Sequence, residues 1–224
     1  MKKHLFLLLC LYTSLHTYGQ KAYKLQSPDG NIQVSISLSD KIYYDVTYQQ
    51  DTLLKQCNLQ MELSNQELGN APKLAGVNKK SVDESLKPVI PLKYSTVANK
   101  YNQLLMKFKG DYSVEFRAFN DGIAYRFITN KKGMIEVNNE TFQVNFPENY
   151  LLHVQHPGGF KTAYEEEYKH IESKDWKSSD KMALLPILID THKDYKILIS
   201  ESDLADYPAL FLKSNGNNGM FLSL

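Results

Sequence analysis

The chain has little cysteine, little tryptophan and almost no net charge. Its 224 residues include two cysteines and one tryptophan, and its formal net charge is +1 at pH 7. So few cysteines cannot build a disulfide framework or a thiolate metal cluster. Cys57, at the end of a strand-like run, is expected to be a small buried residue. No basic patch stands out along the chain, which argues against nucleic acid as a partner.

The chain also has no apolar run long enough to cross a membrane. Its N-terminal apolar stretch, residues 5–11, follows two lysines and precedes small and polar residues, which is the order of a cleavable secretory signal. Because a membrane-spanning helix needs ~20 apolar residues, we expect no membrane anchor. We predict that residues 1–19 are a signal peptide, that the mature chain starts near Gln20, and that a bacterium exports it to the periplasm or the medium. A lipid anchor on Cys10 and a buried N-terminal helix are the alternatives.

What the chain does have is a recurring strand signal. Residues 32–38 alternate strictly between apolar and polar side chains, so an extended chain there has one buried and one solvated face. Turn residues separate such runs, as in Ser-Pro-Asp-Gly at 27–30 and Asn-Asp-Gly at 120–122. The pattern predicts an all-β fold, a large antiparallel two-sheet sandwich. Further strands are expected at residues 43–48, 59–63, 101–109, 112–119, 123–128, 135–137, 141–146, 184–190, 195–201 and 209–212.

Two stretches lack this pattern. Residues 66–91 are polar and are predicted to form a long exposed excursion with a helical turn, and residues 160–181 are rich in charge. We find no internal repeat and no low-complexity linker, so residues 20–224 are predicted to form one domain. A strand begins near residue 219, close to the last residue, so we expect the sandwich to be incomplete at its C-terminal end.

Four segments in register resemble the N-terminal domain of glycoside hydrolase family 97, known for bacterial α-glucosidases and α-galactosidases. Segment 27–31 resembles the opening of that domain, and segment 117–126 resembles its central hairpin, with Phe-Asn-Asp-Gly at the turn. Segment 185–189 resembles a strand that starts beneath the sugar site, and segment 199–210 resembles a paired-strand segment with Asp-Tyr near its end. The resemblance extends from about residue 22 to the last residue and implies a sandwich of the galactose-mutarotase type.

In whole family members this domain precedes a (β/α)8 barrel, which supplies the general acid and the nucleophile or base. Ordinary glycoside hydrolysis needs two carboxylates that flank the scissile bond. Because this chain stops at Leu224, the resemblance implies a non-catalytic domain that supports the active site of an exported α-glycoside hydrolase and forms part of its sugar pocket. The expected partners are an oligosaccharide or α-glycoside and a (β/α)8 barrel, in cis or from an adjacent reading frame.

The acidic sequence Tyr-Glu-Glu-Glu-Tyr at 164–168 is the candidate metal site. Clustered carboxylate oxygens suit a hard cation such as Ca²⁺. In family 97 one glutamate of the N-terminal domain helps to bind Ca²⁺ and has a tyrosine three residues on, which matches Glu165 and Tyr168; Glu166 and Glu167 are the register alternatives. The resemblance implies that the barrel provides the other ligands, so Ca²⁺ is expected as a cofactor only in a full-length enzyme. The alternative is a solvated acidic helix face.

Several other residues are candidates for substrate binding. Arg117 and Arg126 flank the predicted hairpin and either contact sugar hydroxyls or pair with neighbouring carboxylates, and pairing is the preferred interpretation. Trp176 can stack on a sugar ring. Glu201 and Asp206 can hydrogen-bond a ligand or take part in strand packing.

Three histidines invite a metal or acid–base role, because imidazole titrates near neutral pH. The spacing of His153 and His156 resembles no zinc site, and no third ligand is evident. For these two residues and for His170, surface or strand-end positions are the simpler interpretation.

Two other function classes remain open. A free-standing sugar-binding domain would bind oligosaccharides without a barrel. An aldose mutarotase needs a glutamate base and a histidine acid that face one pocket, and here only His153 or His156 with Glu165 or Glu201 qualify. Fold kinship alone is a poor basis for assigning such an activity.

Overall fold

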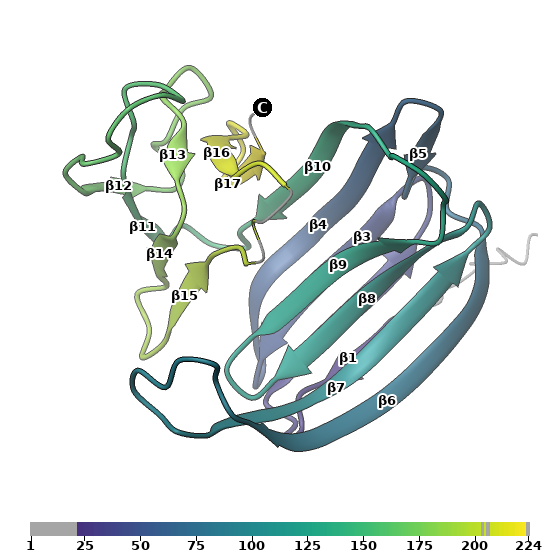
Figure 1. The fold of residues 1–224 in the computed structure, drawn as a ribbon. Helices are drawn as coiled ribbons and strands as arrows, with labels where there is room; N and C mark the ends of the chain where they lie inside the picture. Colours follow the sequence, from purple (N-terminus) through teal and green to yellow (C-terminus); the bar gives the residue numbers. More distant parts are fainter. Residues whose placement is uncertain (1–21, 203, 205–206, 223–224) are drawn as a thin grey trace, which may run out of the picture.

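The computed structural model describes residues 22–202, 204 and 207–222, and these residues form strands without any helix. The predicted signal peptide, residues 1–19, lies outside the described residues. No helix capable of crossing a bilayer occurs in the described part of the chain. Figure 1 shows the strands arranged in three antiparallel sheets.

The largest sheet has nine strands in the order β1-β2-β3-β4-β10-β17-β16-β13, with β5 paired to β4. The second sheet has the order β6-β7-β8-β9, and the third has the order β12-β11-β14-β15. The strands of the first sheet are β1 (Tyr23–Gln26), β2 (Ile32–Leu38), β3 (Ile42–Tyr48), β4 (Asp51–Leu63), β5 (Gln66–Leu68), β10 (Val137–Asn145), β13 (Ala183–Leu184), β16 (Phe211–Ser214) and β17 (Gly219–Leu222). Those of the second are β6 (Leu74–Leu86), β7 (Val97–Phe108), β8 (Tyr112–Phe119) and β9 (Ile123–Thr129). Those of the third are β11 (Leu151–Val154), β12 (Lys169–Glu172), β14 (Ile187–Asp190) and β15 (Lys196–Ile199).

The turn predicted at residues 27–30 is confirmed. The Gly30 amide donates to the Ser27 carbonyl at 2.9 Å, and Gly30 has a φ of 79°, which glycine adopts without steric cost. The Ser27 hydroxyl donates to the Asp29 carboxylate at 2.5 Å, and this bond holds the pKa of Asp29 below its usual value. The turn thereby sets β1 antiparallel to β2.

The hairpin turn predicted at residues 120–122 is also confirmed, and it contacts the first turn. The Phe119 amide donates to the Gly122 carbonyl at 2.8 Å and closes the hairpin between β8 and β9. The Asp29 amide donates to Asn120 Oδ1 at 3.0 Å. Two turns that lie far apart in the sequence therefore meet where the first two sheets face each other.

The sequence prediction for residues 66–91 is wrong. Instead of an exposed excursion with a helical turn, this stretch contains β5 and the long strand β6. β6 pairs with β7 from Leu74 opposite Phe108 to Leu86 opposite Val97. It is an edge strand with mostly exposed side chains, so its sequence has no apolar alternation that would predict a strand. The other predicted strands overlap strands of the structure, with the two expected between residues 135 and 146 merged into β10.

The predicted two-sheet sandwich is confirmed, since the nine-stranded sheet packs on the sheet β6–β9 (Figure 1). Phe116 on β8 has its ring centroid 6.0 Å from that of Tyr44 on β3 and 6.2 Å from that of Tyr125 on β9. Tyr125 in turn stacks on Phe142 of β10, with centroids 6.2 Å apart. Cys57 is buried in this core, as predicted, and burial raises the pKa of its thiol to about 12, so the thiolate is not available for chemistry.

The third sheet adds a smaller unit beside the sandwich, at the left of Figure 1, close to β13, β16 and β17. One face of this small sheet carries Leu152, Ile187 and Ile189, which have no exposed surface. The opposite face is open to solvent, and it carries the partly exposed Leu188 and Leu198 opposite each other on β14 and β15. The candidate functional residues of the C-terminal half lie on this unit and on the loops that leave it.

Candidate functional site

The predicted metal site lies on the acidic loop, residues 160–168, which precedes β12. This loop has no regular secondary structure, so the acidic helix face considered from the sequence does not form. Phe160 packs edge-on against Phe211 of β16, with ring centroids 4.9 Å apart. The Gln155 side-chain amide donates to the Glu166 backbone carbonyl at 2.6 Å. These contacts hold the loop backbone and leave its carboxylates at the surface.

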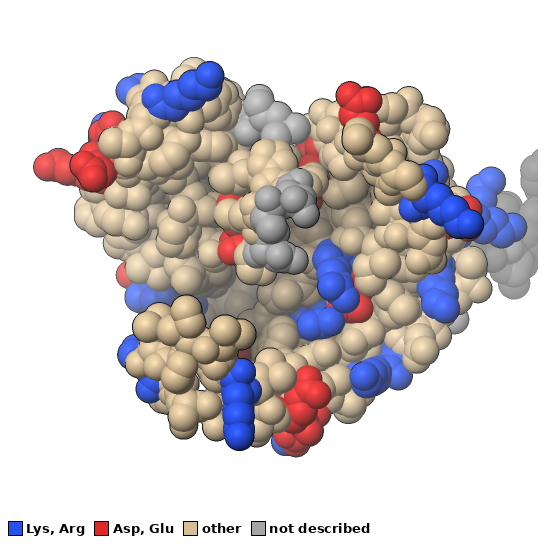
Figure 2. Space-filling model, in the orientation of Figure 1, with Lys and Arg blue, Asp and Glu red and all other residues tan. Residues whose placement is uncertain are grey.

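Glu165, Glu166 and Glu167 are all exposed, and no described residue forms a hydrogen bond or ion pair with their carboxylates. Within the described part of the chain, no three His, Cys, Asp or Glu side chains cluster closely enough to hold a metal ion. Ca²⁺ takes about six to eight oxygen ligands. Figure 2 shows acidic side chains at the outer edge of the molecule, where Figure 1 draws the loop before β12, and away from the central hollow. A second protein surface would have to approach from that outer side to complete a calcium site.

Arg117 and Arg126 pair with a carboxylate, which was the preferred interpretation of the sequence. Glu115 on β8 is only 5% exposed; Arg117 Nε donates to its Oε1 at 2.7 Å, and Arg126 Nη2 lies 3.4 Å from the same oxygen. The Arg117 guanidinium also lies over the Tyr101 ring, 4.7 Å from its centroid. Glu115 and Arg117 alternate along β8 with the core residue Phe116, so they lie on the outer face of the sheet. The Arg126 side chain stays 60% exposed and within reach of a ligand.

Replacing Glu115 by glutamine should destabilise the chain by about 1–2 kcal/mol. The substitution removes the negative charge that two guanidinium groups share, and it leaves these two positive groups close together. Urea unfolding at neutral pH measures the loss. The matched control is Glu62→Gln on the exposed face of β4, where a change within about 0.5 kcal/mol is expected. A loss in Glu115→Gln as small as that of the control would show that the two ion pairs contribute nothing to stability.

Trp176 lies in the core, which corrects the idea that it offers a stacking platform for sugar. Only 2% of the residue is exposed, and its ring centroid lies 6.2 Å from that of His156. The Trp176 carbonyl accepts a hydrogen bond from the Ser214 hydroxyl, which holds this segment to β16. The indole Nε1 is buried and has no hydrogen-bond partner among the described residues. A ring this deeply buried has no open face for a sugar.

Glu201 is engaged within the chain. Both of its carboxylate oxygens accept the Leu210 amide, at 3.0 and 3.1 Å, so Glu201 joins the two ends of the segment between β15 and β16. This is the strand-packing role considered from the sequence, and it occupies the carboxylate. The other acidic candidate in this segment, Asp206, lies outside the described residues.

Glu140 is a partly buried carboxyl group that the sequence did not single out. It projects from β10 and accepts a hydrogen bond from the Tyr207 hydroxyl at 2.8 Å and from the Tyr125 hydroxyl at 3.3 Å. Burial raises the pKa of Glu140; the two tyrosine hydrogen bonds lower it, and the Glu201 charge raises it further, with a net upward shift. Tyr207 belongs to the segment that Glu201 closes, so this carboxyl anchors that segment to the sandwich.

The raised pKa of Glu140 predicts that the contribution of this carboxyl to stability falls as pH rises. The folded chain holds the proton of this carboxyl more tightly than the unfolded chain does. Its contribution is therefore fully present below the unfolded pKa, about 4.3, and is lost as pH rises through the folded pKa. Urea unfolding of the wild type and of Glu140→Gln between about pH 4 and pH 7 should show that the variant lacks this slope, whereas Glu62→Gln keeps it. Equal slopes in all three proteins would contradict the prediction.

The structure brings His153 and His170 together and leaves His156 apart. The Nδ1 atoms of His153 and His170 are 2.6 Å apart, although the sequence considered these residues separately. His156 Nδ1 lies 3.0 Å from the Met182 carbonyl and donates to it. Among the described residues, no hydrogen bond or ion pair joins His153 or His156 to either candidate glutamate base. These contacts therefore give no support to the acid–base pair of a mutarotase.

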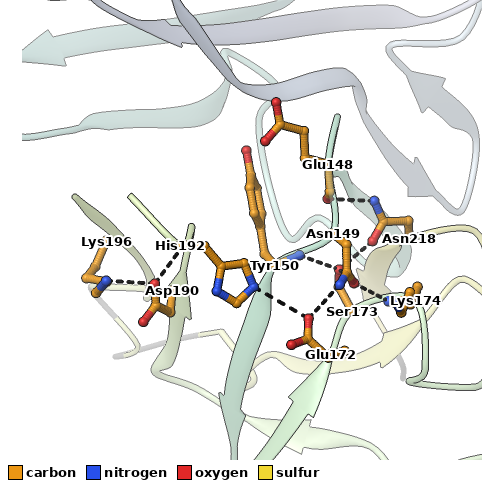
Figure 3. A network of polar contacts seen from close by, with 10 residues as sticks. All are labelled: Glu148, Asn149, Tyr150, Glu172, Ser173, Lys174, Asp190, His192, Lys196 and Asn218. Atoms are coloured by element: carbon orange, nitrogen blue, oxygen red, sulfur yellow. Dashed lines mark hydrogen bonds and ion pairs between the residues drawn. The ribbon is translucent and has the colours of Figure 1, made fainter. Parts of the chain in front are cut away.

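A polar network that the sequence did not reveal ties the small sheet to the hairpin of β16 and β17 (Figure 3). The Ser173 hydroxyl accepts the Tyr150 amide at 2.9 Å and faces the side-chain carbonyls of Asn149, at 3.2 Å, and Asn218. The Asn149 amide donates to the Glu172 carboxylate at 2.6 Å. These residues come from three separate segments and their polar atoms bind one another, so the network braces the fold.

Two shallow grooves lie on the surface formed by the described residues. The larger, with a volume of about 560 Å³, follows β1 and the sheet edge at β6 and β7. Both grooves are lined by lysines together with polar and aliphatic residues, and neither lining includes an aromatic ring. Ligand sites usually combine apolar or aromatic walls with a few polar groups, so these grooves give no support to a self-contained sugar site.

The fold and these sites define an all-β sandwich domain. Among its described residues, three adjacent loop carboxylates face solvent, and most of the other candidate residues make structural contacts. The chain belongs to the glycosyl-hydrolase 97 N-terminal family, whose model matches residues 25–223. It is 35% identical to a retaining α-galactosidase of Bacteroides thetaiotaomicron, in an alignment that covers 96% of this chain and 34% of that protein. The chain thus spans about a third of the length of this relative.

Solved structures of other proteins share the fold. A glycoside hydrolase family 97 enzyme from Pseudoalteromonas sp. strain K8, in complex with acarbose, matches 90% of this chain and 32% of its own, with a TM-score of 0.79 and 22% identity. A β-arabinopyranosidase matches 89% of this chain and 35% of its own, with a TM-score of 0.79 and 23% identity. The predicted family and the predicted sandwich are both confirmed.

Proposed function

We propose that this chain is the N-terminal domain of an exported, Ca²⁺-dependent α-glycoside hydrolase, and that it supports the active site without breaking bonds itself. A (β/α)8 barrel, in cis or from an adjacent reading frame, supplies the catalytic carboxylates. This chain supplies Glu165 as one calcium ligand, with Glu166 and Glu167 as the register alternatives, and part of the wall of the sugar pocket. The family match, and a relative of which this chain spans about a third, support the proposal.

The observation that carries the proposal is the exposure of three adjacent carboxylates on a loop whose backbone is held in place. Three neighbouring negative charges repel one another, and no described residue pairs with them. A cation that is shared with a second domain would compensate this repulsion and would gain charged oxygen ligands. The packing of Phe160 on Phe211 keeps the loop backbone near one position before the cation arrives.

A second feature supports docking of another domain. The connection between β6 and β7, residues 87–96, exposes several large apolar side chains, and Val89 and Leu92 are 100% and 93% exposed. Figure 1 shows this connection projecting at the lower left, and Figure 2 shows it at the rim of the central hollow, with a mostly tan surface and some blue lysine side chains. Exposed apolar surface gathered at one place commonly marks a protein contact. In the proposal, the barrel domain covers this connection.

The class of substrate follows from the relatives. One matching protein is named a retaining α-galactosidase, one structure is a complex with acarbose, and another is a β-arabinopyranosidase. Related domains thus accompany different activities. We infer that this chain serves an enzyme that cleaves glycosidic bonds and that the barrel, rather than this domain, selects the sugar.

An assay of the pure chain on aryl α-galactosides and aryl α-glucosides with Ca²⁺ tests whether the domain is catalytic. The expected result is no turnover, because in the proposal the two carboxylates that flank the scissile bond belong to the barrel. Turnover that requires Ca²⁺ and is lost in Glu165→Gln would overturn the proposal. The alternative function is that of a free-standing sugar-binding domain. Calorimetry with a panel of oligosaccharides tests it, and tight binding by the chain alone would favour it.

A further inference from the structure

His153 and His170 form a pair on the open face of the small sheet. They lie directly opposite each other on the antiparallel strands β11 and β12. His170 is exposed and His153 is half-buried. Their rings meet edge to face with centroids 4.6 Å apart, and their Nδ1 atoms are 2.6 Å apart. The ladder of β11 and β12 therefore aims two ring nitrogens at the same point from rigid backbone positions.

At this distance the two nitrogens share a single proton. A neutral imidazole carries one N–H and one lone pair, so one ring donates from Nδ1 and the other accepts at Nδ1. If the donating ring moves its proton to its own Nε2 through water, both Nδ1 lone pairs face the same point and each ring keeps one N–H. A cation at that point then takes the place of the shared proton without any net loss of protons.

We propose that His153 and His170 form a two-histidine chelate for a borderline divalent transition-metal ion, with a preference for Cu²⁺ and Ni²⁺ over Zn²⁺. Imidazole nitrogen suits these ions, and affinity rises from Ni²⁺ to Cu²⁺ and falls again at Zn²⁺. With metal–nitrogen bonds of about 2.0–2.1 Å, two nitrogens at a right angle lie about 2.9 Å apart, and two at the tetrahedral angle lie about 3.3 Å apart.

The spacing in the structure favours the right-angled arrangement. The nitrogens have to separate by about 0.3 Å for a square-planar or octahedral ion and by about 0.7 Å for a tetrahedral one, starting from 2.6 Å. The χ2 torsion of histidine is broad, so the smaller movement costs little. The tetrahedral arrangement requires the larger movement and is therefore the less favoured of the two.

The surroundings leave the other coordination positions to solvent. Within the described residues no third His, Cys, Asp or Glu side chain joins the pair. Across β14 the next residue in the ladder is Leu188, which offers no ligand atom. Glu172, two residues along β12, is held by Asn149 and by His192. The site is therefore distinct from the acidic loop and uses a different kind of ligand atom, so it does not depend on the proposed calcium role.

Isothermal titration calorimetry of the full chain with Ni²⁺, Cu²⁺ and Zn²⁺, at about pH 8 so that imidazoles are neutral, tests the proposal. The chain has six histidines, so the double variant His153→Gln/His170→Gln measures the baseline of the other four. The wild type should bind one Ni²⁺ or Cu²⁺ above this baseline. Either single variant should weaken that binding by about tenfold or more, because one ring cannot chelate.

His192→Gln is the matched control, since His192 is a half-exposed histidine next to a carboxylate and outside the pair. It should bind as the wild type does, and added Ca²⁺ should leave Ni²⁺ binding unchanged. Near-ultraviolet circular dichroism shows whether each variant keeps its fold. Equal Ni²⁺ and Cu²⁺ binding by the wild type and the double variant would overturn the site, and tighter binding of Zn²⁺ than of Cu²⁺ would overturn its proposed geometry.

Discussion

We expect activity from a chimera in which residues 25–223 of this chain replace the matching third, roughly, of the Bacteroides thetaiotaomicron α-galactosidase. In this chimera, the Glu165→Gln substitution should lower the calcium-dependent activity by about tenfold or more. The amide replaces a charged oxygen ligand by a neutral one and so weakens the calcium site. The measurement is kcat/KM on an aryl α-galactoside as a function of Ca²⁺ concentration. Partial recovery in excess Ca²⁺ would identify a lost ligand rather than a misfolded domain.

Glu166→Gln and Glu167→Gln in the same chimera are the matched controls. All three side chains are exposed on one loop, so none of the substitutions should affect folding. Loss in Glu166→Gln or Glu167→Gln alone would move the ligand to that register alternative. Equal small effects in all three variants would show that the three glutamates contribute only surface charge and no calcium ligand. An inactive chimera with an intact fold would argue against the proposal that this domain supports the active site.

Replacing Phe116 by alanine should destabilise the chain by about 3–5 kcal/mol. The ring has no exposed surface and lies between Tyr44 of the opposite sheet and Tyr125 of its own sheet. Two hydrogen-bonded sheets hold their backbones apart, so the space left by the ring can close only in part. Urea unfolding should show a lower midpoint with an unchanged slope.

Phe221→Ala is the control for size and residue type. Phe221 lies on β17 and is 38% exposed, so its loss should cost about 1 kcal/mol or less. If both variants lost the same stability, the space between the two large sheets could not be the main core. A much larger loss at Phe116 is expected because, of these two rings, only that of Phe116 is fully buried between the sheets.

Much of the fold is predictable from local sequence patterns. Strands with one buried face, such as residues 32–38, carry a strict alternation, and the turns at 27–30 and 120–122 contain residues suited to their backbone angles. The sequence did not predict β6, because both faces of this edge strand are largely exposed. Without a buried face, its side chains need not alternate between apolar and polar. The division of the later strands into a separate sheet depends on non-local pairing, which no short window reports.

The candidate site was predictable to a smaller extent. Arg117 and Arg126 both pair with Glu115, and this was predictable from the sequence. Glu115 lies two residues before Arg117 and directly opposite Arg126 across the hairpin. The contact between His153 and His170 needs the register of two strands joined by a long irregular loop, which the sequence does not provide. The burial of Trp176 likewise depends on tertiary packing, because its charged neighbourhood in the sequence indicated exposure.

Calcium calorimetry on the chain alone and on the chimera tests most directly whether this domain completes a metal site in another domain. The account predicts no binding heat with the chain alone and one Ca²⁺ bound per chimera, weakened by Glu165→Gln. Tight Ca²⁺ binding by the chain alone would contradict it, and so would Ca²⁺ binding by the chimera that none of the substitutions at residues 165–167 alters.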